Sequence, residues 1–401
     1  MRIALLNSFY YPTEPGGAER SVRLLAEELA RQGHEVSVVC LADAARSERI
    51  GGVMVERLPI RNLYLPDANA GRPDAARRLL WHALDSWNPL AVAGLGRILD
   101  RLRPEILHTN NLAGFSVSAW RAASSRGITV VHTTRDFYLM CPSTTMMRGG
   151  RSCQRPCASC QPFAWARRAA SCGVDRVVGI SRFILERHLA NGYFADVPSS
   201  VIYNPFETRE QRPRSPGPVI RLGYIGRLVP TKGLSELMQA VTELRAAGLD
   251  LELRVAGRGR PDFVSALRAA HADLPVEFLG EVAPASFFDQ VDVTVVPSQW
   301  DEPLGRVVIE SLAFGRPVVA SPVGGIPELA VDPCVLLAAS PSPESLGMAI
   351  AEMVRRVRAD TPSLAAACLS AASVYALAPV ASQYAGVFEA AMGRATEAWA
   401  G

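Results

Sequence analysis

The chain has 401 residues, of which 49% are hydrophobic and 20% are charged, and its formal net charge is +3. This length exceeds the range of one ordinary core, so we expect two globular domains, and the composition excludes a disordered chain. A net charge of +3 is too small to indicate a nucleic-acid partner. The sequence shows neither a signal peptide nor an apolar run of about 18 residues, so we expect a cytoplasmic protein.

Short apolar runs rich in Val and Ile alternate with helix-like segments in the first half of the chain. These runs are Arg2–Ser8, Glu35–Ala42, Glu105–Asn111, Ile128–Thr134, Arg176–Ser181 and Ser200–Pro205. Between the first two, Val22, Leu25 and Leu29 mark one face of a predicted helix that stops at Gly33. Nearly continuous apolar strands that alternate with helices predict a parallel sheet covered on both faces. We therefore predict a Rossmann-like domain over residues 1–207.

Residues 208–218 (TREQRPRSPGP) have charge, Pro and Gly but no apolar period, which predicts a linker. The alternation then restarts with Ile220–Gly226, Leu251–Gly257, Val276–Val282, Val291–Ser298 and Pro317–Gly324. We therefore predict a second Rossmann-like domain over residues 219–373 and a C-terminal helical segment over residues 374–401. Two such parallel sheets, facing across a cleft, would bind ligands at the carboxyl ends of their strands.

The stretch Arg61–Arg103 is rich in Arg with interspersed Trp and Leu, as in RRLLWHALDSWNPL. One interpretation is a solvated helix pair over the sheet. The other is a basic amphipathic surface for peripheral contact with an anionic membrane or a lipid-linked acceptor. The sequence leaves both open.

Three loops carry residues suited to an anionic sugar ligand. In EPGGAER, Gly16 and Gly17 precede a helix and let its N-terminus approach a ligand closely. In GRLVPTKG, Arg227 and Lys232 follow a strand, and two cations at a strand end suit a diphosphate. Neither loop is a dinucleotide fingerprint or a Walker A loop.

The third loop lies in PSQWDEPLGRVVIESLAFGRPVVASPVGGIPELA over residues 297–330. Glu302 precedes a turn that is predicted to start a helix, and Glu310 lies eight positions later, which would place both carboxylates on one helix face. Carboxylates accept hydrogen bonds from sugar hydroxyls, and free amides near Leu304–Arg306 would bind phosphate.

At this point the chain resembles glycosyltransferase family 4, a family of retaining enzymes with the GT-B fold. The resemblance rests on the spacing from Glu302 to Glu310 and on the segment that follows it. It extends over almost the whole chain through GGAER, LHTNNLAGFS, VVGISRFILERH, VIYNP and GRLVPTKG.

The resemblance implies a role for each residue that matches a family motif. Arg227 and Lys232 would clamp the donor diphosphate, Glu302 would contact the transferred sugar, and Glu310 would hold the ribose. The remaining donor contacts would come from Gly16, Gly17, Gly257, Leu304 and Gly305.

One position departs from the family. Many relatives carry a His-Asp pair after the fourth strand of the first domain, where this chain has Arg135-Asp136. Because Arg cannot shuttle a proton at neutral pH, the role of that histidine would fall to His132 or to no residue, and we expect His132 and Arg135 on the acceptor side.

Five cysteines crowd into the predicted insertion over residues 141–172. Cys141, Cys153, Cys157 and Cys160 have the spacing C-x11-C-x3-C-x2-C, with Cys172 further on. Four thiolates with a terminal C-x2-C could close a tetrahedral structural zinc site. Packed free thiols and disulfides are the alternatives, and disulfides are disfavoured in a reducing compartment.

We therefore expect a hexosyltransferase-like retaining glycosyltransferase of polysaccharide biosynthesis. It would use a nucleotide-diphosphate sugar, a glycan or lipid-linked acceptor, and no catalytic metal, because no D-x-D motif accompanies the predicted diphosphate site. It would work in the cytoplasm, at the inner face of the membrane if its acceptor is lipid-linked. A sugar-nucleotide epimerase on the same fold and a non-catalytic nucleotide-sugar binding module are the alternatives.

Overall fold

The computed structural model describes residues 1–14, 16–65, 73–207 and 216–398. The chain divides into two compact units. The first comprises Met1–Arg148, Ser152–Pro205 and Leu377–Gly401, and the second comprises Gly149–Arg151 and Phe206–Ala376. Most of the predicted linker, residues 208–215, lies outside the described residues.

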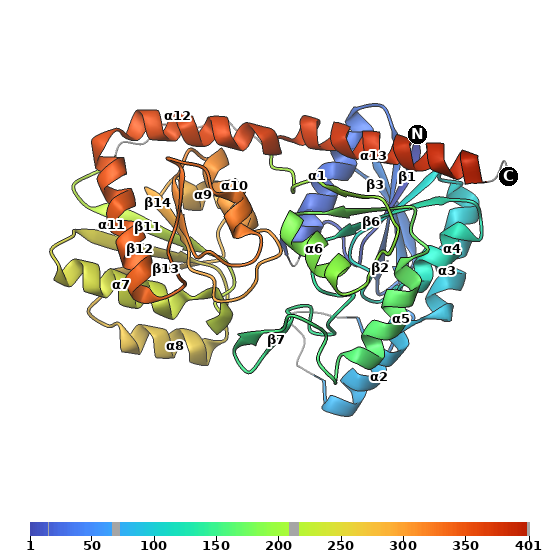
Figure 1. Ribbon diagram of the computed structural model, residues 1–401, viewed down its shortest axis with the longest axis horizontal. Helices are drawn as coiled ribbons and strands as arrows, with labels where there is room; N and C mark the ends of the chain where they lie inside the picture. Colours follow the sequence, from blue (N-terminus) through green and yellow to red (C-terminus); the bar gives the residue numbers. More distant parts are fainter. Residues whose placement is uncertain (15, 66–72, 208–215, 399–401) are drawn as a thin grey trace. The chain divides into compact units, whose positions relative to one another are not determined.

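The first unit is built on an eight-stranded sheet in the order β10-β9-β6-β5-β1-β2-β4-β3. Its strands are β1 (Arg2–Leu6), β2 (Glu35–Ala42), β3 (Arg46–Ile50), β4 (Val53–Pro59), β5 (Ile106–Thr109), β6 (Thr129–Thr134), β9 (Arg176–Gly179) and β10 (Ser199–Val201). All neighbours pair in parallel except β3 and β4. In register, Ile3 of β1 lies between Val36 and Ile106. The predicted parallel sheet is confirmed, and the hairpin of β3 and β4 is an addition at its edge (Figure 1).

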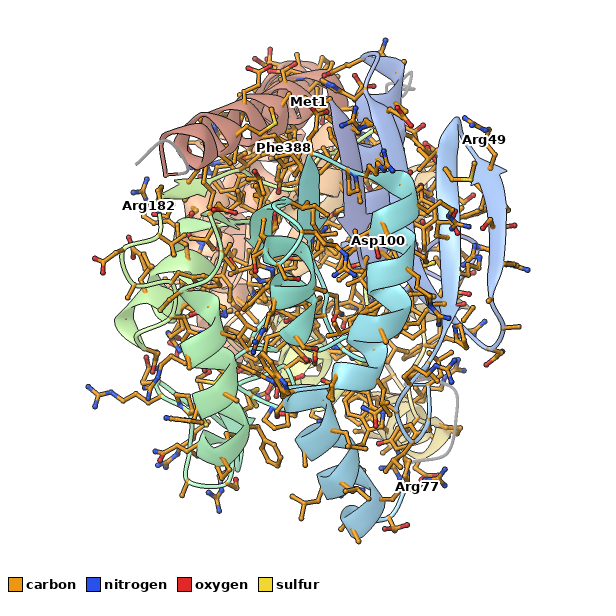
Figure 2. All side chains as sticks on the ribbon, turned by 90° about the vertical axis from the view of Figure 1, so that its right-hand side faces the viewer. Met1, Arg49, Arg77, Asp100, Arg182 and Phe388 are labelled. Carbon is orange, nitrogen blue, oxygen red and sulfur yellow. The ribbon has the colours of Figure 1, made fainter. Side chains whose placement is uncertain are left out.

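Helices cover this sheet, and the C-terminal helix belongs with them (Figure 1). They are α1 (Gly17–Arg31), α2 (Ala75–Ser86), α3 (Pro89–Leu102), α4 (Ser118–Ser124), α5 (Gln161–Ser171), α6 (Arg182–Ala190) and α13 (Leu377–Ala398). Helix α13 packs on α1 and β6, where the rings of Tyr384 and Phe388 lie 5.1 and 5.2 Å from that of buried His108. The last helix thus completes the core of the first unit (Figure 2).

The second unit has six parallel strands in the order β13-β12-β11-β14-β15-β16. They are β11 (Ile220–Ile225), β12 (Leu251–Ala256), β13 (Val276–Gly280), β14 (Val293–Val296), β15 (Val318–Ala320) and β16 (Val335–Leu337). The helices are α7 (Leu234–Ala246), α8 (Pro261–Ala270), α9 (Pro284–Phe288), α10 (Arg306–Ala313), α11 (Pro343–Ala359) and α12 (Thr361–Ala372), with short 3-10 helices η1 (Pro230–Lys232), η2 (Ile326–Leu329) and η3 (Ser373–Tyr375). This confirms the predicted second Rossmann-like domain, to which β16 adds an edge strand.

Within the described residues, no helix combines the length and apolarity that crossing a membrane requires.

Several ionisable groups of the first unit are buried, which shifts their pKa values in two directions. Burial lowers the pKa of His132 to about 3 and of His82 and His188 to about 4, and it holds that of His108 well below its ordinary value. For two carboxyl groups the shift is upward: burial raises the pKa of Asp85 to about 7 and that of Asp136 to about 6.

These shifts predict that the protein loses stability as the pH falls from about 7 toward 4. A histidine in the unfolded chain is protonated as the pH falls through about 6.5, whereas these buried histidines stay neutral in the folded protein. Their contribution to the free energy of unfolding is therefore lost as the pH falls. Asp85 and Asp136 bind protons when folded and offset part of this loss. Each excess proton taken up by the unfolded chain lowers the free energy of unfolding by about 1.4 kcal/mol per pH unit.

Replacing His188 by Phe should make this decline shallower. The His188 Nε2 has no hydrogen-bond partner within the described chain, and its ring already packs against Tyr193 and Phe194. Urea unfolding midpoints of both proteins across this pH range measure the effect. An unchanged pH dependence in His188→Phe would contradict the assignment.

Candidate functional site

Three loops of the second unit follow the carboxyl ends of β11, β12 and β14, and their backbones are in direct contact. The backbone N–H of Gln299, after β14, donates to the carbonyl of Thr231, after β11, at 2.9 Å. Gly233 has a φ of +72°, and a Cβ there would overlap the carbonyl oxygen of Pro297. Only glycine meets both requirements without strain, so Gly233 fixes the two loops against each other.

The loop after β12 joins the same edge of the sheet. A Cβ on Gly257 would overlap the carbonyl oxygen of Gly226, so only a residue without a side chain allows this approach. The N–H of Leu228 donates to the carbonyl of Arg258 at 2.7 Å. Gly257 therefore has a structural reason to be glycine that is independent of any ligand.

Lys232 and Glu302, which sequence analysis predicted separately, form one ion pair. The Lys232 Nζ lies 2.5 Å from the Glu302 Oε1, and the Ser298 hydroxyl donates to the same oxygen at 2.6 Å. The Lys232 ammonium also lies 5.1 Å from the centre of the Trp300 ring. Glu302 is only 8% exposed. The pair is therefore partly desolvated, which strengthens its electrostatic interactions relative to water.

Arg227 differs from Lys232 in being exposed. Its side chain has no hydrogen bond or ion pair within the described part of the chain. Its backbone carbonyl accepts a hydrogen bond from the buried Tyr224 hydroxyl at 2.8 Å. Burial, and secondarily the Glu302 charge, raises the pKa of Tyr224 well above its ordinary value, while Arg227 acts in the opposite direction. The guanidinium is thus a cation free to meet an anion at this edge.

The predicted placement of both carboxylates on one helix face is wrong. Helix α10 begins at Arg306, so Glu302 lies in the preceding loop and only Glu310 lies on the helix. The loop is held by backbone contacts, because the N–H of Gly325 donates to the Glu302 carbonyl at 2.8 Å and a Cβ on Gly324 would overlap the Glu302 backbone. Proline at position 303 and glycine at 305 delay the helix start.

Glu310 is also paired in the structure. Its Oε1 accepts from the Arg306 Nε at 2.7 Å, one helical turn earlier, and Glu310 is 7% exposed. Gly305 precedes the helix, and a Cβ there would lie 2.7 Å from the Ile326 Cγ1, while Leu304 is buried. The amino end of α10 is therefore held against η2 through Gly305.

In the first unit, the predicted glycines lie where the sequence placed them, at the start of a helix. Gly16 precedes α1 and Gly17 is its first residue. Glu19 in the first turn is buried, and burial raises the pKa of its carboxyl, with the Asp136 charge as a further cause. The first turn of α1 thus carries a buried acid that the sequence did not single out.

Arg135 is held in place by two side-chain amides. Its Nε donates to the Asn110 Oδ1 at 2.8 Å and its Nη1 to the Asn204 Oδ1 at 2.6 Å. Arg135 is 6% exposed. Asp136 accepts from the Tyr138 N–H at 2.7 Å, and burial raises its pKa to about 6. Asp136 is therefore the titratable member of the Arg135-Asp136 pair.

His132 cannot take the acceptor-side role that was predicted for it. Its ring is 3% exposed, its Nδ1 is 2.9 Å from the Thr109 hydroxyl, and it stacks on Phe194. Burial, followed by the charges of His188 and Arg135, lowers the pKa of His132 to about 3. His132 is thus a neutral core residue.

The cysteines are all free thiols, so the disulfide alternative is not realised in the structure. The Cys160 sulfur lies 3.4 Å from that of Cys157 and 4.0 Å from that of Cys141. Within the described residues, no group of three or more His, Cys, Asp and Glu side chains is arranged to hold a metal ion.

Sequence analysis missed several residues that shape these sites. Ser298 and Trp300 lie inside the motif of residues 297–330. A serine or tryptophan in a loop does not indicate which side chain it will contact, here Glu302 and Lys232. Asn110 and Asn204 lie within LHTNNLAGFS and VIYNP, and only the fold brings both to Arg135.

Comparison with known proteins identifies the family. Residues 15–210 match the model described as Glycosyltransferase Family 4, and residues 220–356 match Glycosyl transferases group 1. An "Uncharacterized 42.6 kDa protein in cps region" from Klebsiella pneumoniae is 33% identical over 82% of this chain and 87% of its own length. A GDP-mannose-dependent alpha-(1-6)-phosphatidylinositol dimannoside mannosyltransferase from Mycobacterium tuberculosis is 27% identical over 82% of this chain and 81% of its own length.

Solved structures show the same fold. Sucrose-phosphate synthase from Thermosynechococcus elongatus matches with a TM-score of 0.74 and 19% identity over 98% of this chain and 99% of that one. HepE from Anabaena, in complex with UDP and glucose, matches with a TM-score of 0.69 and 18% identity over 97% of this chain and 99% of that one. The chain therefore belongs to glycosyltransferase family 4, and it is a glycosyltransferase with the GT-B fold.

Proposed function

We propose that this glycosyltransferase moves a sugar from a nucleotide-diphosphate donor to a hydroxyl acceptor with retention at the anomeric carbon. The observation that carries the proposal is the Lys232–Glu302 pair beside the free Arg227 cation at one edge of the second sheet. Cations next to a carboxylate suit a ligand with an anionic diphosphate and a hydroxyl-bearing sugar.

In this proposal the cations stabilise the charge that develops on the departing diphosphate. Arg227 offers a planar fork and Lys232 a compact charge, and the amides near Leu304 and Gly305 add donors at the amino end of α10. Because these groups are preorganised, they act as an electrostatic site for the leaving group. Two protein cations in this position can take the part of a divalent metal, so we propose transfer without a catalytic metal.

The two carboxylates would each bind one of the remaining parts of the donor. Glu302 would accept hydrogen bonds from the transferred sugar, and Glu310 would accept them from the ribose. Both carboxylates are paired in the structure, with Lys232 and with Arg306. Donor hydroxyls would therefore share or replace existing bonds, and the carboxylates stay oriented before the donor arrives. Gly257 and its loop would neighbour the base, and Gly16 and Gly17 would leave room for donor and acceptor at the edge of the first unit.

For the acceptor we propose a glycan or lipid-linked intermediate of polysaccharide biosynthesis, with Arg135 as a positive charge on that side. Named relatives act on phosphatidylinositol derivatives, which are lipid-linked acceptors. A lipid-linked acceptor requires contact with a membrane, and we propose that the protein makes it as a peripheral protein from the cytoplasm.

Exposed apolar side chains on α2 and α3 support this contact. Leu79 and Leu80 are 61% and 52% exposed, Trp87 between the helices is 41% exposed, and Leu90 is 67% exposed. Arg77, at the end of α2 in Figure 2, is an exposed cation on the same helix. Apolar residues with neighbouring arginines are typical of helices that lie in a membrane interface.

The first test of the proposed function is turnover across a panel of nucleotide-diphosphate sugars with a glycan acceptor, in a strong chelator. Arg227→Ala and Lys232→Ala should each lower turnover by about ten- to a thousandfold, because each removes a charge-assisted contact to phosphate. Arg355→Ala, which removes an exposed cation on α11, is the matched control and should keep full activity.

Folding of each variant is followed by circular dichroism. Wild-type turnover in folded Arg227→Ala and Lys232→Ala would refute the clamp. Conversion of the donor without an acceptor would instead indicate an epimerase, and binding without any turnover would indicate a binding module. Activity that is lost in chelator and restored by magnesium or manganese would refute metal-independent transfer.

The two carboxylates should be separable by calorimetry. Glu310→Gln should weaken binding of the bare nucleoside diphosphate by about tenfold, since it removes a charged hydrogen-bond acceptor from the ribose. Glu302→Gln should leave that binding nearly unchanged and weaken the full sugar donor. Equal loss of bare-nucleotide affinity in both variants would exclude this division.

Membrane contact is tested by sedimentation with vesicles. The wild type should bind vesicles that contain anionic phosphatidylglycerol more strongly than pure phosphatidylcholine, and salt should weaken the binding. Replacing Leu79, Leu80 and Leu90 by Ser should reduce binding at least about tenfold, because apolar area is removed. Met348→Ser, at an exposed apolar site on α11, is the control. Wild-type protein that stays in the supernatant would end this part of the proposal.

A further inference from the structure

Four cysteines of the first unit surround a short hairpin and the start of a helix. The hairpin consists of β7 (Met147–Arg148) and β8 (Arg151–Ser152), with Cys141 before it and Cys153 directly after it. The Cys153 N–H donates to the Met146 carbonyl at 2.6 Å and closes the hairpin. The Cys157 carbonyl accepts from the Cys160 N–H at 2.8 Å, which forms the turn that opens α5. The fold thus brings distant cysteines together from three local structures.

Two distances among three of these sulfurs are close to those of a thiolate metal site. The Cys160 Sγ lies 3.4 Å from the Cys157 Sγ and 4.0 Å from the Cys141 Sγ. A disulfide would require about 2.05 Å. Four sulfurs at about 2.3 Å from a zinc ion lie about 3.8 Å from one another, because the ion is tetrahedral. The two observed distances lie on either side of this tetrahedral edge.

The hairpin has little else to stabilise it. Its strands have two residues each, and two-stranded hairpins are marginally stable in water even when longer. Thr144 and Met146, in the turn before it, have φ values of +59° and +50°, which are unfavourable for residues with a side chain. A segment this short, with strained turns and few buried residues, needs a cross-link or a metal to hold one conformation.

We propose that Cys141, Cys153, Cys157 and Cys160 form a structural zinc site that fixes the hairpin to α5. As placed in the structure, the four side chains do not form a metal-binding group, so the site would close by rotation of the cysteine side chains about single bonds. One zinc ion replaces four thiol protons and leaves a net charge of −2 on the four-thiolate cluster. Arg187 donates to the Cys153 carbonyl at 3.1 Å, which places a cation beside this charge.

The zinc site would also stabilise, through α5, a part of the first unit that it does not contact. Arg167 on this helix is fully buried, where it pairs with Asp85 of α2 at 3.3 Å and donates to the Tyr138 carbonyl at 2.5 Å. Fixing the first turn of α5 therefore also fixes a buried ion pair in the core of the first unit. The proposal concerns stability and is independent of the proposed transfer reaction.

Elemental analysis of the full-length wild-type protein gives the first measurement. We expect about one zinc per chain, and removal with a chelator should lower the melting temperature by at least about 5 °C, which added zinc chloride restores. Donor binding, measured by calorimetry on the same samples, should persist without zinc. This readout separates failure of the zinc site from failure of the proposed function.

Single variants identify the ligands. Cys157→Ser and Cys160→Ser should lower zinc content at least about tenfold and reduce the melting temperature, whereas Cys172→Ser should do neither. Cys172 is the matched control because it is an exposed cysteine at the end of the same helix. Wild-type protein with eight titratable thiols and no zinc after purification and zinc addition would overturn the proposal. Fewer than eight thiols without zinc would also overturn it, in favour of a disulfide.

Discussion

The candidate site of the second unit depends on backbone packed directly against backbone. At Gly233, Gly257 and Gly324 a single added carbon would overlap a carbonyl or amide of a neighbouring loop. These contacts hold the loops after β11, β12 and β14 and the Glu302 segment at one edge of the sheet. Lys232 and Glu302, which are 70 positions apart in the chain, can pair only because Gly233 and Gly324 let their loops approach so closely. The glycines thus position the charged side chains of Lys232 and Glu302 through contacts of the backbone alone.

The ion pair that results has consequences for ligand binding in the proposed mechanism. Lys232 and Glu302 compensate each other while the site is partly buried, and breaking such a pair without replacement is costly. A phosphate that draws Lys232 away leaves Glu302 with the Ser298 hydroxyl alone. A sugar hydroxyl bound to Glu302 restores the lost bond. The two halves of a sugar nucleotide would therefore support each other, and this coupling favours the intact donor over its separate parts.

The sequence predicted what depends on local pattern. The parallel strands were recognisable because buried strands form apolar runs, and the cationic loop because Arg227 and Lys232 are close in sequence. What failed depended on tertiary context. Glu302 was placed on a helix that begins four residues later, because Pro303 and Gly305 delay its start. The hairpin of β3 and β4 was missed although Gly51-Gly52 is a turn signal, because β3 (RSERI) has almost no apolar residues to mark it as a strand. His132 was assigned a role on the acceptor side, and only the fold shows that it is buried.

The first unit is organised around a different constraint, the burial of a charged network. Asp85 and Arg167 are both fully buried, and Asp85 also accepts from the Tyr138 hydroxyl at 2.7 Å and the Gly114 N–H at 2.6 Å. Removing one member would leave an uncompensated buried charge, which is strongly destabilising. The network joins α2, on which Leu79 and Leu80 are exposed, to α5, which begins directly after Cys160. Because α2 and α5 share this network, a change that loosens the cysteine segment should also disturb the helix proposed to contact the membrane.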